Sequence, residues 1–546
     1  MGKIPAEYLP PKEHLPEKIY PLPEVRLPQK LNLAHLGLDR NIIEGRGSNI
    51  AILYQDRKIT YLELQREVNR LANGLRSLGL EKNDRVMLRS SNRPEFIVGC
   101  FACWKIGAIP VLVNHMLKSE EIVFRANDSE ARAILVSSDT FAEVEKSLPQ
   151  FRTVDRVIVF GEKVGKYHFY DDLIKGQPDQ VELAETTKDD LMRIIYSSGT
   201  TGKPKGIITT IGDAVAGRKI IGRHLLDLKP QDVVGGHPIF TFAFGFGLIF
   251  VCFGSEGCAL SIVEKFDPEL MFETIQSHRI TVLRCVPTAF RMMLGVKDAE
   301  KKYDLSSLRL CQSAGEWLPG DTAREWRARF GVGILDSVGS ADLMYWLSTR
   351  LDTPDDKLDS SGKPIPGVEC KVVDADFNEV PRGTPGELIV RAPWGQQYWR
   401  RPDKQKEGVK HGWNRPGLIY VEDEDGYFWY KGRDDEMIVS SGYKIPGGEV
   451  EGALLSHEAV LEAAVVPSPD PVRGNIVKAF VVLKEGWKPS DRLAEELRDF
   501  VKEKIEAYKY PREVEFVDGR SLARTSTGKI QRFVLREREK EIKGER

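Results

Sequence analysis

Apolar residues along the first third of the chain follow two alternating patterns. Between Tyr61 and Leu78 they recur every three or four residues, which places them on one face of a helix, and Gly79 predicts its end. The runs 85–89 and 109–113 are short and apolar, as in buried strands, with a helical pattern at 94–106 between them. Repeated strand–helix units of this kind predict a parallel sheet covered by helices on both faces.

The same alternation continues to about residue 313 and then changes. Further strands are predicted at 49–54, 58–60, 132–136, 155–160, 190–196, 281–287 and 307–313. From about Lys363 short β segments with Gly and Pro turns take over, and the chain after Arg433 combines two helical with two strand patterns. We therefore expect an α/β protein in two parts: a large N-terminal domain of βα-layered sheets plus β segments (1–432), and a small mobile α+β C-terminal domain (433–546).

Composition narrows the classes of protein that fit. The 546 residues are 41% hydrophobic and 29% charged, as in globular proteins, and 79 Lys and Arg against 81 Asp and Glu argue against nucleic acid as a partner. No apolar run approaches the roughly 20 residues of a membrane span, and the Pro-rich N-terminus is predicted to be an extended surface arm rather than a signal peptide. Seven cysteines form no disulfide framework, so we expect a cytoplasmic protein. The CxxC at Cys100 and Cys103 lies in an apolar run, which favours two core thiols over a redox or metal pair.

The segment Tyr196–Gly206, YSSGTTGKPKG, follows a predicted buried strand and has the composition of a phosphate-binding loop. Glycines let backbone N–H groups approach a polyanion, hydroxyls add donors, and lysines supply positive charge. It lacks the spacing of a Walker A loop, and an ordinary Gly/Ser surface loop is the alternative. The candidate phosphate-binding residues are Ser197, Ser198, Gly199, Thr200, Thr201, Gly202, Lys203 and Lys205.

This segment resembles the signature of the acyl-adenylate-forming superfamily, which includes acyl-CoA synthetases, peptide-synthetase adenylation domains and luciferases. Matching segments follow in the family's order at 313–316, 362–369, 386–391, 426–443 and 525–532, so the resemblance spans nearly the whole chain. It implies that a carboxylate attacks the α-phosphorus of Mg²⁺-bound ATP to give acyl-AMP and pyrophosphate. Coenzyme A then displaces AMP.

The resemblance also implies roles for individual residues. Lys529 resembles the lysine that bridges carboxylate and α-phosphate, and Lys205 and Asp342 are the other residues we expect to be catalytic. Asp435 resembles the hinge about which the small domain turns, exchanging Lys529 for the segment Ser441, Gly442 and Tyr443 in the thiol half-reaction. The residues expected on the nucleotide are Gly315, Glu316, Asp336 and Arg433.

The acyl group is expected at Phe242, Ala243, Phe244 and Gly245, where relatives line the acyl pocket. These side chains would form a flat apolar wall suited to an aromatic ring, although plain core packing would leave the same pattern. The local sequence at 412–451 resembles most the benzoate and 2-aminobenzoate CoA ligases. We therefore expect an aromatic, benzoate-like acid.

Three positions depart from the family pattern. Ala341 replaces a threonine that meets the α-phosphate, and Asp342 replaces the magnesium-binding glutamate with a shorter carboxylate. Leu418 replaces an aspartate that accepts the ribose hydroxyls and cannot itself accept a hydrogen bond. An alternative hypothesis is therefore a relative with weakened or lost adenylation that binds an acyl or nucleotide ligand. A luciferase or a peptide-synthetase domain fits less well.

Overall fold

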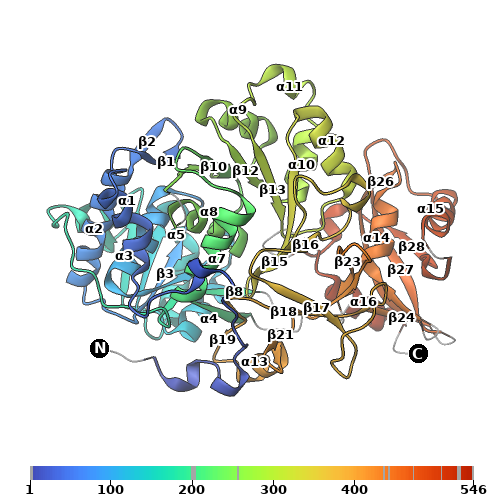
Figure 1. Cartoon of the computed structure of the whole chain (residues 1–546), viewed down its shortest axis with the longest axis horizontal. Helices are drawn as coiled ribbons and strands as arrows, with labels where there is room; N and C mark the ends of the chain where they lie inside the picture. The colour runs from blue at the N-terminus through green and yellow to red at the C-terminus, as the bar shows by residue number, and fades with distance from the viewer. Residues whose placement is uncertain are drawn as a thin grey trace. The chain divides into compact units, whose positions relative to one another are not determined.

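The computed structural model describes residues 4–197, 204–254, 257–433, 437–440, 443–470, 473–505, 507–524 and 530–543. The chain forms two compact units. The described part of the first lies within 4–370 and 390–416, and that of the second within 371–389 and 417–543. The chain therefore crosses between the units after Cys370, within strand β17 (Glu369–Val373), after Ile389, within strand β18 (Gly386–Arg391), and after Pro416 (Figure 1).

The first unit contains two sheets, of which one has eight strands in the order β19-β9-β8-β4-β3-β5-β6-β7. Strands β3 to β8 are mutually parallel, whereas β9 and β19 pair antiparallel at one edge. The strands are β3 Arg85–Arg89, β4 Ile109–Leu112, β5 Ala133–Ser137, β6 Arg156–Phe160, β7 His168–Phe169, β8 Leu191–Ser197, β9 Lys205–Thr210 and β19 Tyr398–Trp399. The associated helices are α2 Tyr61–Ser77, α3 Pro94–Ile106, α4 Ser119–Ser129, α5 Phe141–Ser147, α6 Tyr170–Ile174 and α7 Ile211–Lys219.

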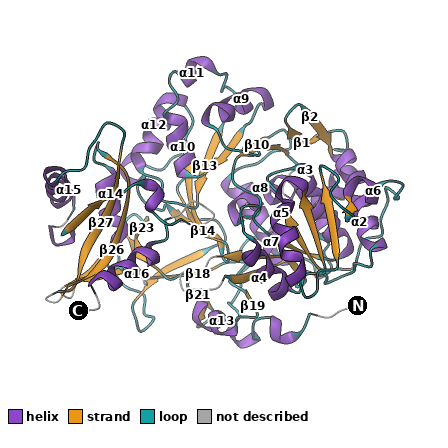
Figure 2. Ribbon diagram, turned by 180° about the vertical axis from the view of Figure 1, so that it is seen from behind, coloured by secondary structure: helices purple, strands orange, loops and turns teal. Residues whose placement is uncertain are grey.

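The other sheet has nine strands in the order β16-β15-β14-β13-β12-β10-β11-β1-β2. It is parallel from β1 to β14, with antiparallel strands at its two edges. The strands are β1 Ile50–Tyr54, β2 Arg57–Thr60, β10 Val233–Gly236, β11 Ala259–Ile262, β12 Val282–Cys285, β13 Leu310–Ala314, β14 Ile334–Ser340, β15 Met344–Ser348 and β16 Lys363–Pro364. Helices α8 Ala243–Gly254, α9 Pro268–His278, α10 Pro287–Leu294, α11 Ala299–Lys302 and α12 Gly320–Phe330 accompany it; α9, α10 and α12 lie beside β13 in both views (Figures 1 and 2).

Local sequence signals account for the helix ends. Thr60 and Glu63 form a capping box that satisfies free backbone N–H groups at the start of α2. Gly79 follows the helix with a φ of +79°, a conformation that glycine adopts without strain. Helix α3 is buried almost all round, as its apolar sequence predicts, and includes the thiols of Cys100 and Cys103. Burial raises the pKa of both thiols, so they behave as inert core residues.

The N-terminal arm contains three short 3₁₀ turns at Ala6–Tyr8, Lys12–His14 and Pro23–Val25. It is not merely a surface strap, because Val25 is fully buried and the Lys18 ammonium lies 2.5 Å from the Asp213 carboxylate. In the described part of the chain, no helix is both long enough and apolar enough to cross a membrane.

The second unit is built on a three-stranded sheet in the order β26-β27-β28. Its apolar core joins these strands to α14 and α15. Its elements are β22 Leu418–Glu422, β23 Phe428–Arg433, β24 Met437–Ser440, β25 Tyr443–Pro446, α14 Gly447–Leu455, β26 Val460–Asp470, β27 Gly474–Leu483, α15 Asp491–Lys504, β28 Glu513–Phe516 and α16 Arg532–Lys543. The elements near strand β18 are β17 Glu369–Val373, α13 Pro402–Gly408, β20 Val409–Lys410 and β21 Trp413–Asn414. The α/β class predicted from the sequence is confirmed.

Candidate functional site

The two ends of the predicted phosphate loop lie opposite each other on neighbouring strands. Ser197 ends β8 and Lys205 begins β9, and the two residues pair across the antiparallel ladder. The Ser197 hydroxyl oxygen is buried and has no hydrogen-bond partner within the described ranges. Ser198, Gly199, Thr200, Thr201, Gly202 and Lys203 lie outside the described residues.

Lys205, Asp342 and Tyr398 come together from three distant segments. The Lys205 ammonium lies 3.5 Å from Oδ2 of Asp342 and 3.2 Å from the Tyr398 hydroxyl. That hydroxyl donates a hydrogen bond to Asp342 Oδ2, and the Ser340 hydroxyl donates to Oδ1 at 2.5 Å. The Asp342 side chain is only 12% exposed. Although burial acts to raise its pKa, the Lys205 charge and these hydrogen bonds lower the pKa below the ordinary value, so Asp342 is a carboxylate.

The turn that carries Asp342 is held by its backbone. It joins β14 to β15, and a Cβ at Gly339 would lie 2.1 Å from the Met344 carbonyl oxygen, so only glycine fits there. The Trp394 indole N–H donates to the Leu343 carbonyl at 2.7 Å. Asp342 is thus held in place on a rigid turn beside the lysine.

The residues expected at the adenine lie at the ends of two paired strands. Ser313 of β13 is directly opposite Asp336 of β14, and Gly315 follows β13 with a φ of +93°. The Glu316 carboxylate accepts a hydrogen bond from the Thr288 hydroxyl at 2.8 Å. Asp336 is 4% exposed, and burial raises its pKa to about 7. Its Oδ1 is buried and has no hydrogen-bond partner in the described part of the chain.

The residues expected at the acyl group lie at the start of α8. Phe242, Ala243 and Phe244 are partly exposed, whereas Gly245 is buried. A Cβ at Gly245 would lie 2.0 Å from the Ile239 carbonyl oxygen, so glycine lets the chain pass closely behind the helix start. These residues therefore form a partly open apolar face.

A charged residue lies against this face. Arg284 of β12 is fully buried, and its guanidinium lies over the Phe244 ring, 4.9 Å from the ring centroid. Its Nε donates to Gln312 Oε1 at 2.7 Å, and one Nη donates to the Tyr345 hydroxyl at 3.1 Å. Gln312 in turn donates to the Ser337 hydroxyl at 2.9 Å. A buried hydrogen-bond network around Arg284 therefore lies next to the apolar residues at the start of α8.

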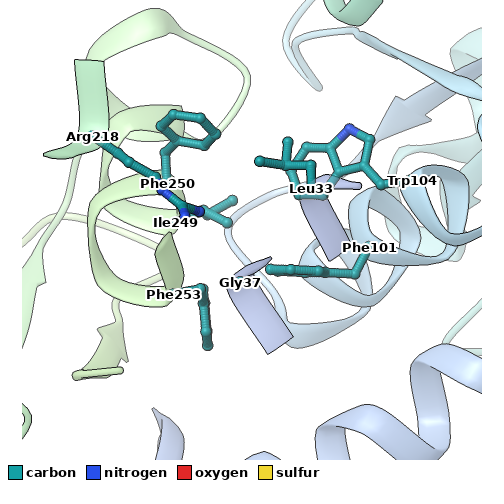
Figure 3. A pocket seen from close by; sticks show the side chains of 8 residues that line it. All are labelled: Leu33, Gly37, Phe101, Trp104, Arg218, Ile249, Phe250 and Phe253. Atoms are coloured by element: carbon teal, nitrogen blue, oxygen red, sulfur yellow. The ribbon is translucent and has the colours of Figure 1, made fainter. Parts of the chain in front are cut away.

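The opposite side of α8 packs into the core. Figure 3 shows Ile249, Phe250 and Phe253 of α8 across a small cavity from Leu33, Phe101 and Trp104. The cavity measures about 10 Å³, which accommodates at most one water molecule. At 100° per residue these α8 positions lie opposite Phe244, so this packing fixes the rotation of α8 and the cavity is too small for an acid.

In the second unit, Leu418 and Arg433 are directly opposite each other on β22 and β23. The leucine therefore occupies a place where a carboxylate would contact the arginine. Tyr443 begins β25, and its side chain is not described. Asp435, Ser441, Gly442 and Lys529 lie outside the described residues.

Comparison with known proteins identifies the family. Residues 40–399 match the model of the AMP-binding enzyme family, and residues 449–529 match that of the AMP-binding enzyme C-terminal domain. The chain belongs to the AMP-binding enzyme family. It is 36% identical to a benzoate–CoA ligase of Thauera aromatica (94% of this chain, 97% of that protein). It is 34% identical to an acetyl-coenzyme A synthetase of Bacillus subtilis strain 168 (93% and 90%).

The solved structures agree with this assignment. A crystal structure of the anthranilate CoA ligase AuaEII in complex with anthranoyl-AMP superposes with a TM-score of 0.88 at 33% identity, covering 96% of this chain and 100% of that one. This AMP-binding enzyme is accordingly an AMP-forming acyl-CoA ligase, a class that uses ATP, Mg²⁺ and coenzyme A.

The residues present fit a magnesium ion brought by the nucleotide. No group of three potential metal ligands occurs within the described ranges, so the protein has no closed metal cage there. Mg²⁺ commonly uses one or two carboxylates together with substrate phosphates and water. Asp342 can serve as that carboxylate, because it is ionised and its Oδ1 accepts a hydrogen bond from the neutral Ser340 hydroxyl. The ion would neutralise phosphate charge.

Sequence reasoning missed Arg284, Tyr345 and Tyr398. Arg284 carried a signal, because a charged residue interrupts the buried strand Val282–Cys285 and such residues need a specific reason to be buried. Tyr398 and Tyr345 carried none, since tyrosines are common in strands and their partners are remote in sequence.

Proposed function

We propose that this enzyme activates a benzoate-like carboxylic acid with ATP and transfers the acyl group to coenzyme A. In the first half-reaction a carboxylate oxygen bonds to the α-phosphorus and pyrophosphate leaves. In the second, the coenzyme A sulfur bonds to the acyl carbon, AMP leaves, and the thiol proton passes to solvent. The observation that carries the proposal is the Lys205–Asp342–Tyr398 cluster at the end of the phosphate loop.

The first half-reaction collects negative charge around one phosphorus, so its catalysts are fixed cations and donors. Lys205 would contact phosphate oxygens while Asp342 holds the magnesium and Tyr398 keeps both in position. Lys529 would bridge the acid to the α-phosphate. Gly315, Glu316, Asp336 and Arg433 would bind the nucleoside.

The proposed second half-reaction uses a different arrangement of the chain. The domains 1–432 and 433–546 would turn about Asp435. Lys529 would then give way to Ser441, Gly442 and Tyr443, and coenzyme A would reach the acyl carbon.

An aromatic acid is favoured by Phe242 and Phe244, whose partly exposed rings offer stacking surfaces. A benzoate ligase and an anthranilate ligase among the relatives support the same class. An acetyl-coenzyme A synthetase is nearly as similar, so the acid must be tested directly.

The test is pyrophosphate release with saturating ATP and Mg²⁺ against a panel of benzoates, short-chain acids and fatty acids. We expect release that depends on the acid and is fastest with benzoates. Equal or faster release with acetate would contradict the aromatic assignment. No release with any acid would overturn the ligase proposal.

A second candidate, a relative that binds ligands without adenylating, is favoured by Leu418 opposite Arg433. Loss of a charge-assisted hydrogen bond costs about 1.5–3 kcal/mol, or roughly tenfold or more in affinity. Calorimetry with ATP and AMP separates the candidates, because a pure acyl binder gives no nucleotide heat. If the ligase proposal holds, Leu418→Asp tightens nucleotide binding by about tenfold.

A further inference from the structure

We infer that Arg284 is a specificity-determining residue that binds a second hydrogen-bond acceptor on the acyl group, a carboxylate most strongly. The preferred substrate class is then an aromatic acid bearing a further anionic or oxygen-acceptor substituent. This inference rests on the proposed function and specifies the substrate of the same site.

The charge of Arg284 is not balanced by a neighbouring carboxylate among the described residues. Arg284 is fully buried, and no carboxylate oxygen of the described residues lies within 4.0 Å of its nitrogens. Its partners are the neutral groups of Gln312 and Tyr345 and the face of Phe244. A buried cation without a counter-charge is costly, and one cation–π contact offsets only part of that cost. A ligand with a negative group would remove the imbalance.

One nitrogen of the Arg284 guanidinium is an unused donor. Among the described residues the buried Nη1 has no hydrogen-bond partner, whereas Nε and Nη2 each donate a hydrogen bond within the protein. Two internal hydrogen bonds hold the guanidinium plane and leave the Nη1 donors free. A guanidinium that is held in a fixed plane and keeps free N–H donors is suited to binding a carboxylate.

The guanidinium of Arg284 lies next to helix α8. A Cβ placed on Gly247 would lie 3.5 Å from Nη2 and 3.6 Å from Nη1, so the guanidinium faces α8 where that helix has no side chain. Gly247 and Phe244 lie three residues apart on one face of α8, and both are partly exposed. The free donors therefore adjoin the face proposed for the acyl group.

The chemistry of arginine determines which substituents on the acid are favoured and which are rejected. Its nitrogens only donate, so carboxylate and hydroxyl oxygens are accepted, a methyl group leaves the donors unpaired, and an aromatic amine offers a poor acceptor. A site whose polar groups are left unpaired rejects the wrong analogue more strongly than an apolar pocket does.

The experiment compares kcat/KM for pyrophosphate release with benzoate and its methyl, amino, hydroxyl and carboxyl derivatives at each ring position. We expect the best carboxyl derivative to exceed benzoate by roughly 10- to 100-fold, with hydroxyl derivatives between, since charge-assisted bonds contribute about 1.5–3 kcal/mol. In Arg284→Met the preference should vanish, so that kcat/KM for the carboxyl derivative no longer exceeds kcat/KM for benzoate in the same variant. Arg284→Lys should recover part of it.

Tyr345→Phe is the matched control, because it removes an internal partner of the same guanidinium and leaves Nη1 unchanged; it should keep the preference. Should Arg284→Met fail to fold, calorimetry of the wild-type protein with the matched methyl and carboxyl derivatives gives the same comparison. Equal use or binding of methyl, hydroxyl and carboxyl derivatives would overturn the inference while leaving the ligase proposal intact. No release with any acid would overturn both.

Discussion

Asp342 is the residue on which the proposed first half-reaction most depends. Its lowered pKa keeps it ionised at every pH at which the enzyme would be assayed, and its carboxylate lies beside Lys205. We expect Asp342→Asn to reduce kcat/KM for pyrophosphate release by about 100-fold, because a fixed charge at the reacting phosphates is lost.

Asp355→Asn is a suitable control, since this 61% exposed aspartate pairs with Arg327 at the surface of the same unit. It should leave the rate unchanged. A rate for Asp342→Asn within threefold of the wild type would show that the carboxylate plays no part in the reaction.

Asp336 predicts a pH dependence of stability. Burial raises its pKa from an ordinary value of about 3.9 to about 7, so between these values the folded chain holds a proton that the unfolded chain has released. The free energy of unfolding therefore falls as the pH rises through this window, by at most roughly 4 kcal/mol. Asp336→Asn should remove this fall and stabilise the protein at pH 8 relative to the wild type, as measured by urea denaturation at pH 5 and pH 8.

Asp403→Asn controls for the loss of an acid. The neighbouring Arg401 holds the pKa of Asp403 at about 2, so this group is ionised in both states from pH 5 to pH 8. Asp403→Asn should therefore leave the change in the free energy of unfolding between pH 5 and pH 8 as it is in the wild type. If Asp336→Asn also left that change unaltered, the raised pKa could not be assigned to the Asp336 carboxyl.

At the scale of elements, helix α16 is joined to its sheet by a buried charge network. Glu539 is fully buried, and its carboxylate lies 2.8 Å from the Lys478 ammonium of β27 and accepts from the Ser468 hydroxyl at 2.7 Å. Removing Glu539 deprives the Ser468 hydroxyl of its acceptor and leaves the Lys478 ammonium with the more exposed carboxylates of Glu515 and Glu513. We expect Glu539→Ala to destabilise the second unit by about 1.5–3 kcal/mol, seen as faster hydrogen exchange in β26 and β27.

Glu537→Ala on the same helix is the matched control. Glu537 is 61% exposed and forms an i,i+3 pair with Lys540, a kind of contact that contributes under about 1 kcal/mol. If both substitutions change exchange equally, the buried network is not what holds α16.

Elements were predictable where the pattern was local. The helix expected at 94–106 has the bounds of α3, because Pro at its start and Gly107 after its end are local signals. The antiparallel edge strand β19 was not expected, because two residues carry no periodicity. The link from Arg284 to Gln312 and Tyr345 spans 28 and 61 residues, so it follows from the order of parallel strands and not from any local motif.

At the scale of the whole molecule, the pattern of the sequence changes from strand–helix alternation to short β segments near the point where the chain first leaves the first unit. The shift to short β segments from about Lys363 precedes the first crossing, after Cys370. The expected boundary after residue 432 places Val390–Pro416 with the first unit, where Tyr398 pairs with β9, but the chain order gave no sign that Lys371–Ile389 groups with the second unit. Long-range strand pairing decides this.

A substitution of Lys529 should separate the two half-reactions. Lys529 is proposed to act only while negative charge builds up at the α-phosphate, whereas thiol attack occurs at the acyl carbon and is assigned to Ser441–Tyr443. Lys529→Ala should therefore lower pyrophosphate release by about 10²- to 10³-fold. Conversion of added acyl-AMP and coenzyme A to the thioester should stay within about threefold of wild type, because no bond to the α-phosphate has to form.

Lys540→Ala supplies the control, since this 64% exposed lysine lies on α16, further along the chain, and pairs with Glu537. Both half-reactions should be unaffected. Equal loss of both in Lys529→Ala would mean that the lysine binds the ligand throughout. One arrangement of the domains would then serve both steps, and the exchange proposed for Asp435 would have no role.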